Sequence, residues 1–243
     1  MFNKAEDSIM FVTNESNFNK IPGSPIAYWT SSSFAQNYLN PPLSTVSEII
    51  TGMTIGDNNQ YLRLWFELIV DGIAFNKGTM KEINLLETKW IPYSKGGTRR
   101  NWYGNYEYVV NWGKKDNFNR SKTTLQHLYL REALTWPFIT SGTFSARLLP
   151  KGSLWDVAGS PCFFKSTEEE YYVLGLLCSN VVDYILKVVN PTINVQAIDI
   201  AQLPYVEKEK GEVIDIVNVN IEMSKKDWDS FETSWDFKKH PLI

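Results

Sequence analysis

The chain has 243 residues, which is enough for one large domain or two small ones. Hydrophobic residues make up 43% of it and charged residues 21%, ordinary values for a globular protein, so composition indicates neither disorder nor a membrane class. The formal net charge is -3. Because the N-terminus lacks a signal-peptide pattern and no run reaches about 18 apolar residues, we expect a cytoplasmic protein with no membrane partner.

The first predicted elements lie before residue 70. Residues 1–24 are expected to form an extended lead-in that ends at the turn signal Pro22-Gly23-Ser24-Pro25. A helix capped by Ser24 is then predicted to run as far as Pro41-Pro42. Its loose apolar stripe consists of Ile26, Trp29, Phe34 and Leu39. Strands are predicted at 46–50 and 61–70, with a loop containing two glycines between them.

The middle of the chain is predicted to be β-rich. Short runs of strand-forming residues occur at 89–93, 106–112, 135–140 and 144–149, separated by Gly, Asn, Ser and Lys. This pattern favours a curved sheet or partial barrel. We therefore predict an α+β fold, with a β-rich lobe, flanking helices and a helical C-terminal segment.

Helical periodicity begins at Glu168. The helix face is formed by Tyr171, Leu174, Leu177, Val181, Val182, Ile185 and Val188. We expect a break at Ser179-Asn180, an end at Pro191 and a further short helix at 199–203. The acidic segment 207–212 is predicted to be a linker, and the aromatic stretch 223–243 is expected to pack against another surface, in this chain or beyond it. The predicted organisation is a lead-in and connecting helix at 1–45, a central domain at 46–205, and a linker with a docking segment at 206–243.

Charge is unevenly distributed along the chain. Between Lys89 and Lys151 there are eleven basic residues and three acidic ones, a local net charge of +8. A basic middle within an acidic chain is typical of a protein that presents one face to a polyanion, although chance clustering on a solvated surface is the alternative.

No enzymatic motif is complete. Amino-methyltransferases carry Asn/Asp-Pro-Pro followed by an aromatic ring, which stacks on the target base, but Asn40-Pro41-Pro42 is followed by Leu43. No glycine-rich strand-to-helix turn precedes it, so we interpret this segment as the end of a helix. Cys162 and Cys178 lack metal-binding spacing, and the two histidines have no accompanying nucleophile or metal motif. We therefore predict no catalytic residues and no metal site.

The strongest chemical cluster lies at 95–105. Its glycines would let the backbone approach a phosphate, which Lys95 would neutralise. Arg99 and Arg100 could grip phosphate or the guanine edge, Asn101 could read adenine, and Trp102 and Tyr103 offer stacking faces. The alternative is a basic hairpin loop whose aromatic side chains turn into the core. Further basic candidates, suited to contacts with the DNA backbone, are Lys114, Lys115, Arg120, Lys122 and Arg147.

A series of short motifs supports a family resemblance. In chain order they are Pro22-Gly-Ser-Pro-Ile-Ala-Tyr-Trp29, Thr54-Ile-Gly-Asp-Asn58 with Tyr61-Leu-Arg63, Lys89-Trp-Ile-Pro-Tyr-Ser-Lys-Gly-Gly97, Trp102-Tyr-Gly-Asn105, Thr135-Trp136, Lys151-Gly152, Leu174-Gly175-Leu-Leu-Cys-Ser-Asn180, Asn190-Pro-Thr-Ile-Asn194 and the segment from Ser224 to Phe237. In this order, the motifs resemble the region that follows the catalytic domain in PglX-like adenine methyltransferases of BREX phage defence and in YeeA-like type II methylases.

The resemblance implies a parent enzyme that uses S-adenosylmethionine to methylate the N6 amine of adenine in double-stranded DNA. This chain lacks the cofactor-binding motifs, so it resembles the target-recognition region alone, with no cofactor of its own and no activity by itself. In this family the glycine loop marks the start of the recognition domain, which makes Thr54, Asp57, Asn58 and Arg63 candidates for DNA contact. The alternative for that loop is a β-turn with Asx capping.

The expected partners are double-stranded DNA and a catalytic domain of the parent chain, with other defence-system subunits as further candidates. Two other classes of function stay open at this point. The acidic flanks and the Trp-rich tail could form a protein-interaction module, and the aromatic residues could form a carbohydrate-binding surface.

Overall fold

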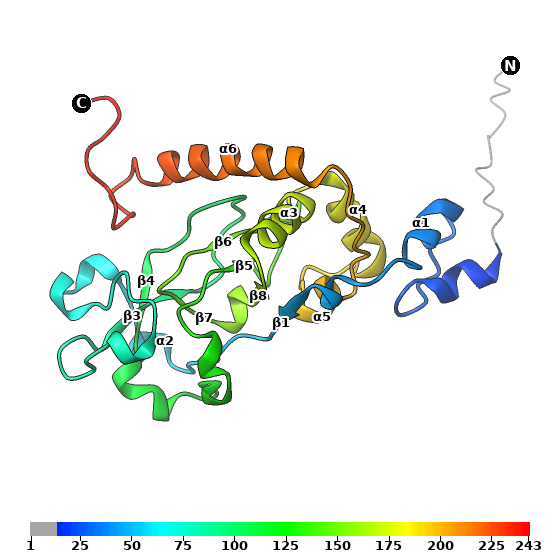
Figure 1. The fold of residues 1–243 in the computed structure, drawn as a ribbon. Coiled ribbons are helices and arrows are strands. Elements are labelled where there is room, and N and C mark those ends of the chain that lie inside the picture. The colour runs from blue at the N-terminus through cyan, green and yellow to red at the C-terminus, as the bar shows by residue number, and fades with distance from the viewer. Residues whose placement is uncertain (1–13) are drawn as a thin grey trace, which may run out of the picture.

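Two open four-stranded sheets form the centre of the fold in the computed structural model, which describes residues 14–243 (Figure 1). The first sheet is antiparallel throughout, in the order β1 (Ser47–Ile49), β8 (Pro161–Phe164), β5 (Ala133–Thr135) and β6 (Arg147–Leu149). The second has the order β2 (Leu62–Leu64), β4 (Tyr108–Asn111), β3 (Trp90–Ser94) and β7 (Leu154–Trp155). Only β3 and β7 are parallel. The mixed architecture confirms the predicted α+β class.

The first sheet is the middle layer of the molecule. Successive side chains of a strand point to opposite faces, so Cys162 and Phe164 of β8 enter one hydrophobic core while Phe163 enters the other. Leu148 and Leu149 of β6 divide in the same way. One core lies between this sheet and the helices, and the other lies between the two sheets.

The helical layer confirms the predicted break. Helices α3 (Thr167–Leu177) and α4 (Asn180–Val189) are separated by Cys178 and Ser179, and the Ser179 side-chain oxygen accepts a hydrogen bond from the Val182 N–H. The short helix α5 (Ala197–Ala201) follows, close to its predicted position. Among the described residues no single helix is long and apolar enough to cross a membrane. The bent pair α3 and α4 meets that limit only when taken together, across a bend of 69°.

Helix α6 (Lys210–Trp228) lies along α3 and begins inside the acidic segment that was predicted to be a linker (Figure 1). Gly175 makes the close approach of the two helices possible, because a Cβ there would lie 2.8 Å from Val213. The tail beyond α6 packs on its own chain, where Trp235 contacts the ring of Phe75 at 5.1 Å between centroids. This agrees with the expectation that the aromatic stretch packs against another surface.

The N-terminal prediction is partly wrong. Residues 1–13 of the expected lead-in lie outside the described residues, and the following residues form a 3-10 helix (Glu15–Lys20) rather than an extended segment. The next helix, α1, covers only Ser32–Asn37 and is capped by Ser31 instead of Ser24. Ile26 and Leu39 of the expected apolar stripe are exposed, at 74% and 72%.

The predicted strand at 61–70 is also shorter than expected. Tyr61 ends the short helix α2 (Asn58–Tyr61), and β2 is followed by 3-10 turns. Strands β7 and β8 were not predicted. The remaining 3-10 segments are Leu43–Thr45, Trp65–Glu67, Val70–Gly72, Met80–Glu82, Trp112–Asn117, Thr123–Leu128 and Val157–Gly159.

Candidate nucleic-acid interface

Lys95 is held inside the fold by an acidic partner. Its Nζ lies 2.8 Å from Oδ2 of Asp156, a side chain that is 1% exposed. The Tyr93 hydroxyl donates to the same carboxylate oxygen at 2.9 Å. The buried Asp156 thus neutralises the charge that the sequence assigned to a phosphate, and Lys95 positions the loop instead.

Gly96 allows close packing of two backbones. Its φ of +80° lies in the left-handed region, and a Cβ there would collide with the Ala158 carbonyl group. The prediction that this glycine faces a phosphate is therefore wrong, because a turn of the same chain occupies that side of its backbone.

Arg100, Trp102 and Tyr103 are engaged by the fold. The Arg100 guanidinium lies 3.5 Å from Asp227 and 5.0 Å from the ring centroid of Trp228. Tyr103 is buried, and burial raises the pKa of its hydroxyl, which accepts a hydrogen bond from Lys225. Trp102 is half-buried and packs against the helix-side core. The alternative of a loop with aromatics turned inward is therefore correct for Tyr103 and in part for Trp102.

Arg147 is fully buried, so its predicted DNA contact is wrong. It lies on β6 of the middle sheet, where both faces are covered, and its guanidinium donates to the Gly96 carbonyl. Asn101 is half-buried in the same loop. Arg147 therefore supports the 95–105 loop from β6, and the Asn101 Oδ1 is buried without a hydrogen-bond partner among the described residues.

Arg99 remains at the surface. Its Nε donates to the Thr143 carbonyl at 3.3 Å, and the side chain is otherwise exposed. It lines a cavity of about 330 Å³ together with Thr98 and Thr140. Of the cationic side chains predicted in the 95–105 loop, Arg99 is the most available to a ligand.

A second group of predicted residues is brought together from distant parts of the sequence. Thr54 and Arg120 exchange two backbone hydrogen bonds of 2.9 Å, and the Arg120 guanidinium donates to the Thr54 hydroxyl at 3.3 Å. Lys122 follows in the chain, and its pKa is lowered by partial burial and by the positive charge of Arg120. We refer to Thr54, Arg120 and Lys122 as the Arg120 surface.

The other residues of the glycine loop have local roles. Asp57 caps α2 by accepting a hydrogen bond from the Gln60 N–H at 3.1 Å, which is the Asx capping considered as the alternative. The Arg63 guanidinium donates to the carbonyl of Asn59. Asn58 and Arg63 nevertheless line a cavity of about 370 Å³, so part of each side chain remains accessible.

The predicted pair of lysines differs in its surroundings. Lys114 is exposed, whereas Lys115 is half-buried and lies 3.5 Å from Asp116. Both lie in the 3-10 segment that leads to the Arg120 surface.

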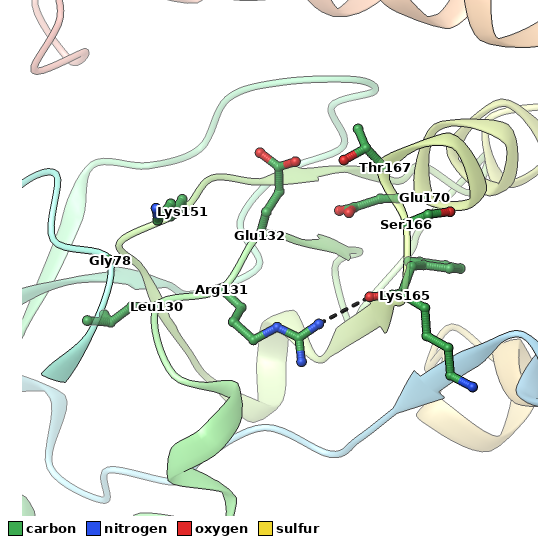
Figure 2. A pocket seen from close by; sticks show the side chains of 10 residues that line it. Gly78, Leu130, Arg131, Glu132, Lys151, Lys165, Ser166, Thr167 and Glu170 are labelled. Atoms are coloured by element: carbon green, nitrogen blue, oxygen red, sulfur yellow. Dashed lines mark hydrogen bonds between the residues drawn. The ribbon is translucent and has the colours of Figure 1, made fainter.

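One cavity contains residues that were not selected from the sequence (Figure 2). It has a volume of about 250 Å³, and the exposed Arg131 and Lys151 line it together with the carboxyl groups of Glu132 and Glu170. Glu170 follows the cap residue Ser166 in an acidic first helical turn. Because acidic residues are common in the first turn of a helix, nothing in the sequence indicated that the Glu170 side chain is buried.

The Asn40-Pro41-Pro42-Leu43 segment packs as a structural element. Leu43 is 0% exposed, and its N–H donates to the Leu203 carbonyl at 2.8 Å. No aromatic ring of this motif stands at its end to hold a base, so these residues do not fit the catalytic motif of an amino-methyltransferase. Within residues 14–243 no group of three His, Cys, Asp or Glu side chains could hold a metal ion.

The relatives of the chain agree with the motif resemblance. No protein-family model matches it. The chain is 34% identical over 237 residues to the adenine-specific methyltransferase BrxX of Escherichia coli O9:H4 (strain HS), a match that covers 95% of this chain and 19% of that protein. It is 36% identical over 247 residues to the adenine-specific methyltransferase PglX of Lacticaseibacillus casei (strain Zhang), covering 96% of this chain and 20% of that protein. The chain is therefore related, over nearly its whole length, to a segment of about one fifth of these PglX-like adenine-specific methyltransferases.

Proposed function

We propose that this chain is the DNA-contacting, target-recognition part of an N6-adenine DNA methyltransferase of the BREX kind. It holds duplex DNA through the Arg120 surface and Arg99, while methyl transfer belongs to a catalytic domain outside this sequence. S-adenosylmethionine would bind to that domain. A DNA partner would place the chain in the cytoplasm.

The observation that carries the proposal is the pairing of Thr54 with Arg120. Two segments more than 60 residues apart were each selected as DNA contacts, and the backbone hydrogen bonds place them side by side. Among the described residues, neither Arg120 nor Lys122 forms an ion pair with a carboxylate. Two adjacent cations without acidic partners favour a phosphate-bearing ligand.

The cationic surface is smaller than the net charge of +8 suggests. Lys95, Arg100 and Lys115 have acidic partners, and Arg147 is buried. If Arg99, Arg120 and Lys122 neutralise about three phosphates, the logarithm of the affinity should fall with the logarithm of salt concentration with a slope near -3. The proposal therefore implies weak, salt-sensitive binding.

The test is fluorescence anisotropy of a labelled duplex titrated with the chain from about 50 to 200 mM salt. Arg120→Ala and Lys122→Ala should each weaken binding severalfold and reduce the salt slope by about one. Lys208→Ala is the matched control, because its side chain is 82% exposed and lies in a different part of the fold. Equal losses in all three variants, or an affinity independent of salt, would contradict the proposal.

Arg99 and Arg100 provide a second comparison. Arg99→Ala should weaken binding more than Arg100→Ala, because Asp227 and the Trp228 ring already occupy the Arg100 guanidinium.

The competing proposal is a docking module for other defence-system subunits. Its predicted contacts were the acidic flanks and the Trp-rich tail. In the tail, Trp228 is 7% exposed and Trp235 packs on Phe75 of the same chain. These two tryptophans are thus largely covered, although Phe231 is 51% exposed, so the DNA-contacting role is better supported.

A further inference from the structure

Helix α6 presents apolar side chains on two opposite faces. On the inner face, where α6 packs on α3, Val217 is 1% exposed and Ile221 is 9% exposed. On the outer face Ile216, Val219 and Met223 are 61%, 56% and 66% exposed. Their spacing of three and four residues places them in one line along the helix. We refer to Ile216, Val219 and Met223 as the outer stripe of α6.

The outer stripe does not have the composition of a helix surface that faces water. Surface helices of soluble proteins carry polar residues on the side away from the core. Ile216 and Val219 are β-branched, and such residues have a lower helix propensity than the Ala, Glu or Lys that suit exposed positions. Figure 1 shows α6 at the border of the molecule, and among residues 14–243 no element covers the stripe. A helix that is apolar on both faces is typical of one that lies between two layers.

Acidic residues border the outer stripe. Glu212, Asp215 and Glu222 are exposed, and none of them forms an ion pair among the described residues. This charge disfavours DNA, because the carboxylates would repel its phosphates. It also disfavours a second copy of the chain, because pairing two such stripes would bring like charges together. The complementary surface is therefore apolar, with Lys or Arg at its border.

The length of the outer stripe favours a partner in the same polypeptide. The stripe runs from Ile216 to Met223, a rise of about 10 Å along the helix. A stable complex between separate proteins buries roughly 800 Å² on each partner, which is far more than this stripe offers. Domains joined in one polypeptide pair through smaller surfaces, because the connection keeps their effective concentration high.

The relatives contain the length of chain that such a partner needs. The matched segments cover 19% of BrxX and 20% of PglX, so about four fifths of each relative has no counterpart in this chain. The outer stripe also lies away from the proposed DNA contacts. Figure 1 shows the 3-10 segments Trp112–Asn117 and Thr123–Leu128, which flank Arg120 in the chain, across the molecule from α6.

We propose that the outer stripe of α6 is the surface on which the catalytic domain of the methyltransferase packs, through an apolar patch bordered by Lys or Arg. This rests on the proposed function, which assigns methyl transfer to a domain outside this sequence. Helix α6 then lies between two layers, with α3 on its inner side and the catalytic domain on its outer side. The contact fixes the recognition part relative to the catalytic domain and leaves the Arg120 surface accessible to DNA.

The test uses the full-length PglX of Lacticaseibacillus casei in which this chain replaces the matching segment. The photo-reactive residue benzoylphenylalanine, introduced at Val219, should form cross-links to the catalytic domain, at apolar residues close to Lys or Arg. Mass spectrometry of the digested protein locates these cross-links. The matched control position is Ile193, which is 57% exposed and lies outside α6, and it should give far fewer cross-links to that domain.

The replacement Val219→Glu tests the same contact without a chemical probe. In the full-length chimera it should lower the melting temperature and reduce the rate of DNA methylation on the order of tenfold, because it places an unpaired charge in an apolar contact. In the isolated chain, where the stripe is exposed, it should change the melting temperature by less than about 2 °C. Ile193→Glu is the control and should leave both proteins unchanged.

Each contrary result overturns the inference. These results are equal cross-linking from Val219 and Ile193, cross-links from Val219 only to residues 1–13 or to a second copy, and an unchanged chimera carrying Val219→Glu. Failure of the chain to give a folded chimera in both PglX and BrxX would also contradict it, because neither catalytic domain would then offer a complementary surface.

Duplex binding by the isolated chain separates this inference from the proposed function. Salt-sensitive binding that Val219→Glu leaves unchanged would show that the proposed function holds even where the docking contact fails. Cross-links from Val219 to the catalytic domain, in a chain that does not bind duplex DNA, would contradict the DNA-contacting role and keep the docking contact.

Discussion

Glu170 should make the stability of the chain fall as pH rises. Burial and the neighbouring Glu132 raise its folded-state pKa to about 8, above the ordinary value of 4.5, so between these values the folded chain holds a proton that the unfolded chain has released. Stability therefore decreases with pH in this window. Each pH unit contributes about 1.4 kcal/mol, so the full cost above pH 8 is roughly 5 kcal/mol.

The replacement Glu170→Gln removes this cost because the amide does not ionise. We expect the variant and the unmodified chain to have similar free energies of unfolding at pH 5. At pH 9 the variant should be more stable by several kcal/mol. The assay is urea unfolding monitored by tryptophan fluorescence at pH 5, 7 and 9, with Glu168→Gln as the matched control. Parallel stability profiles for the variant and the unmodified chain would refute the assigned burial of Glu170.

Replacements at three positions test how the 95–105 loop is held. Arg147→Ala should lower the free energy of unfolding by about 3 to 5 kcal/mol in urea titrations, because it creates a cavity and removes the donor to the Gly96 carbonyl. Arg147→Met should lower the free energy of unfolding by less. Gly96→Ala should reduce the yield of folded protein and its melting temperature, because the added Cβ meets the Ala158 carbonyl at a positive φ. Asp156→Asn should cost about 1 to 3 kcal/mol, measured in the same way, because Lys95 loses its charged partner.

The parts of the fold that follow local rules could be predicted from the sequence. The break between α3 and α4 follows from a periodic apolar face and the cap residue Ser179, and both are visible within a few residues of sequence. Strand β8 was missed for the opposite reason. Because both of its faces are buried, its apolar run shows no alternation that distinguishes a strand from other buried segments.

The candidate site could be predicted only in part, because charge neutralisation is non-local. Asp156 lies 61 residues from Lys95, and Asp227 lies 127 residues from Arg100. A sum of charges over a segment does not include such partners. Arg120 and Lys122 belonged to the same basic stretch, but which of its cations remain unpaired depends on the tertiary fold.

The turn Val157–Gly159 and the preceding Asp156 connect the Arg120 surface with the loop that carries Arg99. The N–H of Val157 donates to the Met53 carbonyl at 2.7 Å, and Met53 immediately precedes Thr54 of the Arg120 surface. On the other side, the Ala158 carbonyl contacts the backbone of Gly96, close to Lys95. The loop that carries Arg99 and the strand-like segment that carries Thr54 are therefore supported by one short element of the core. Because this element is hydrogen-bonded to one segment and packed against the other, and its Asp156 and Gly159 are buried, the two cationic groups should keep a fixed spacing.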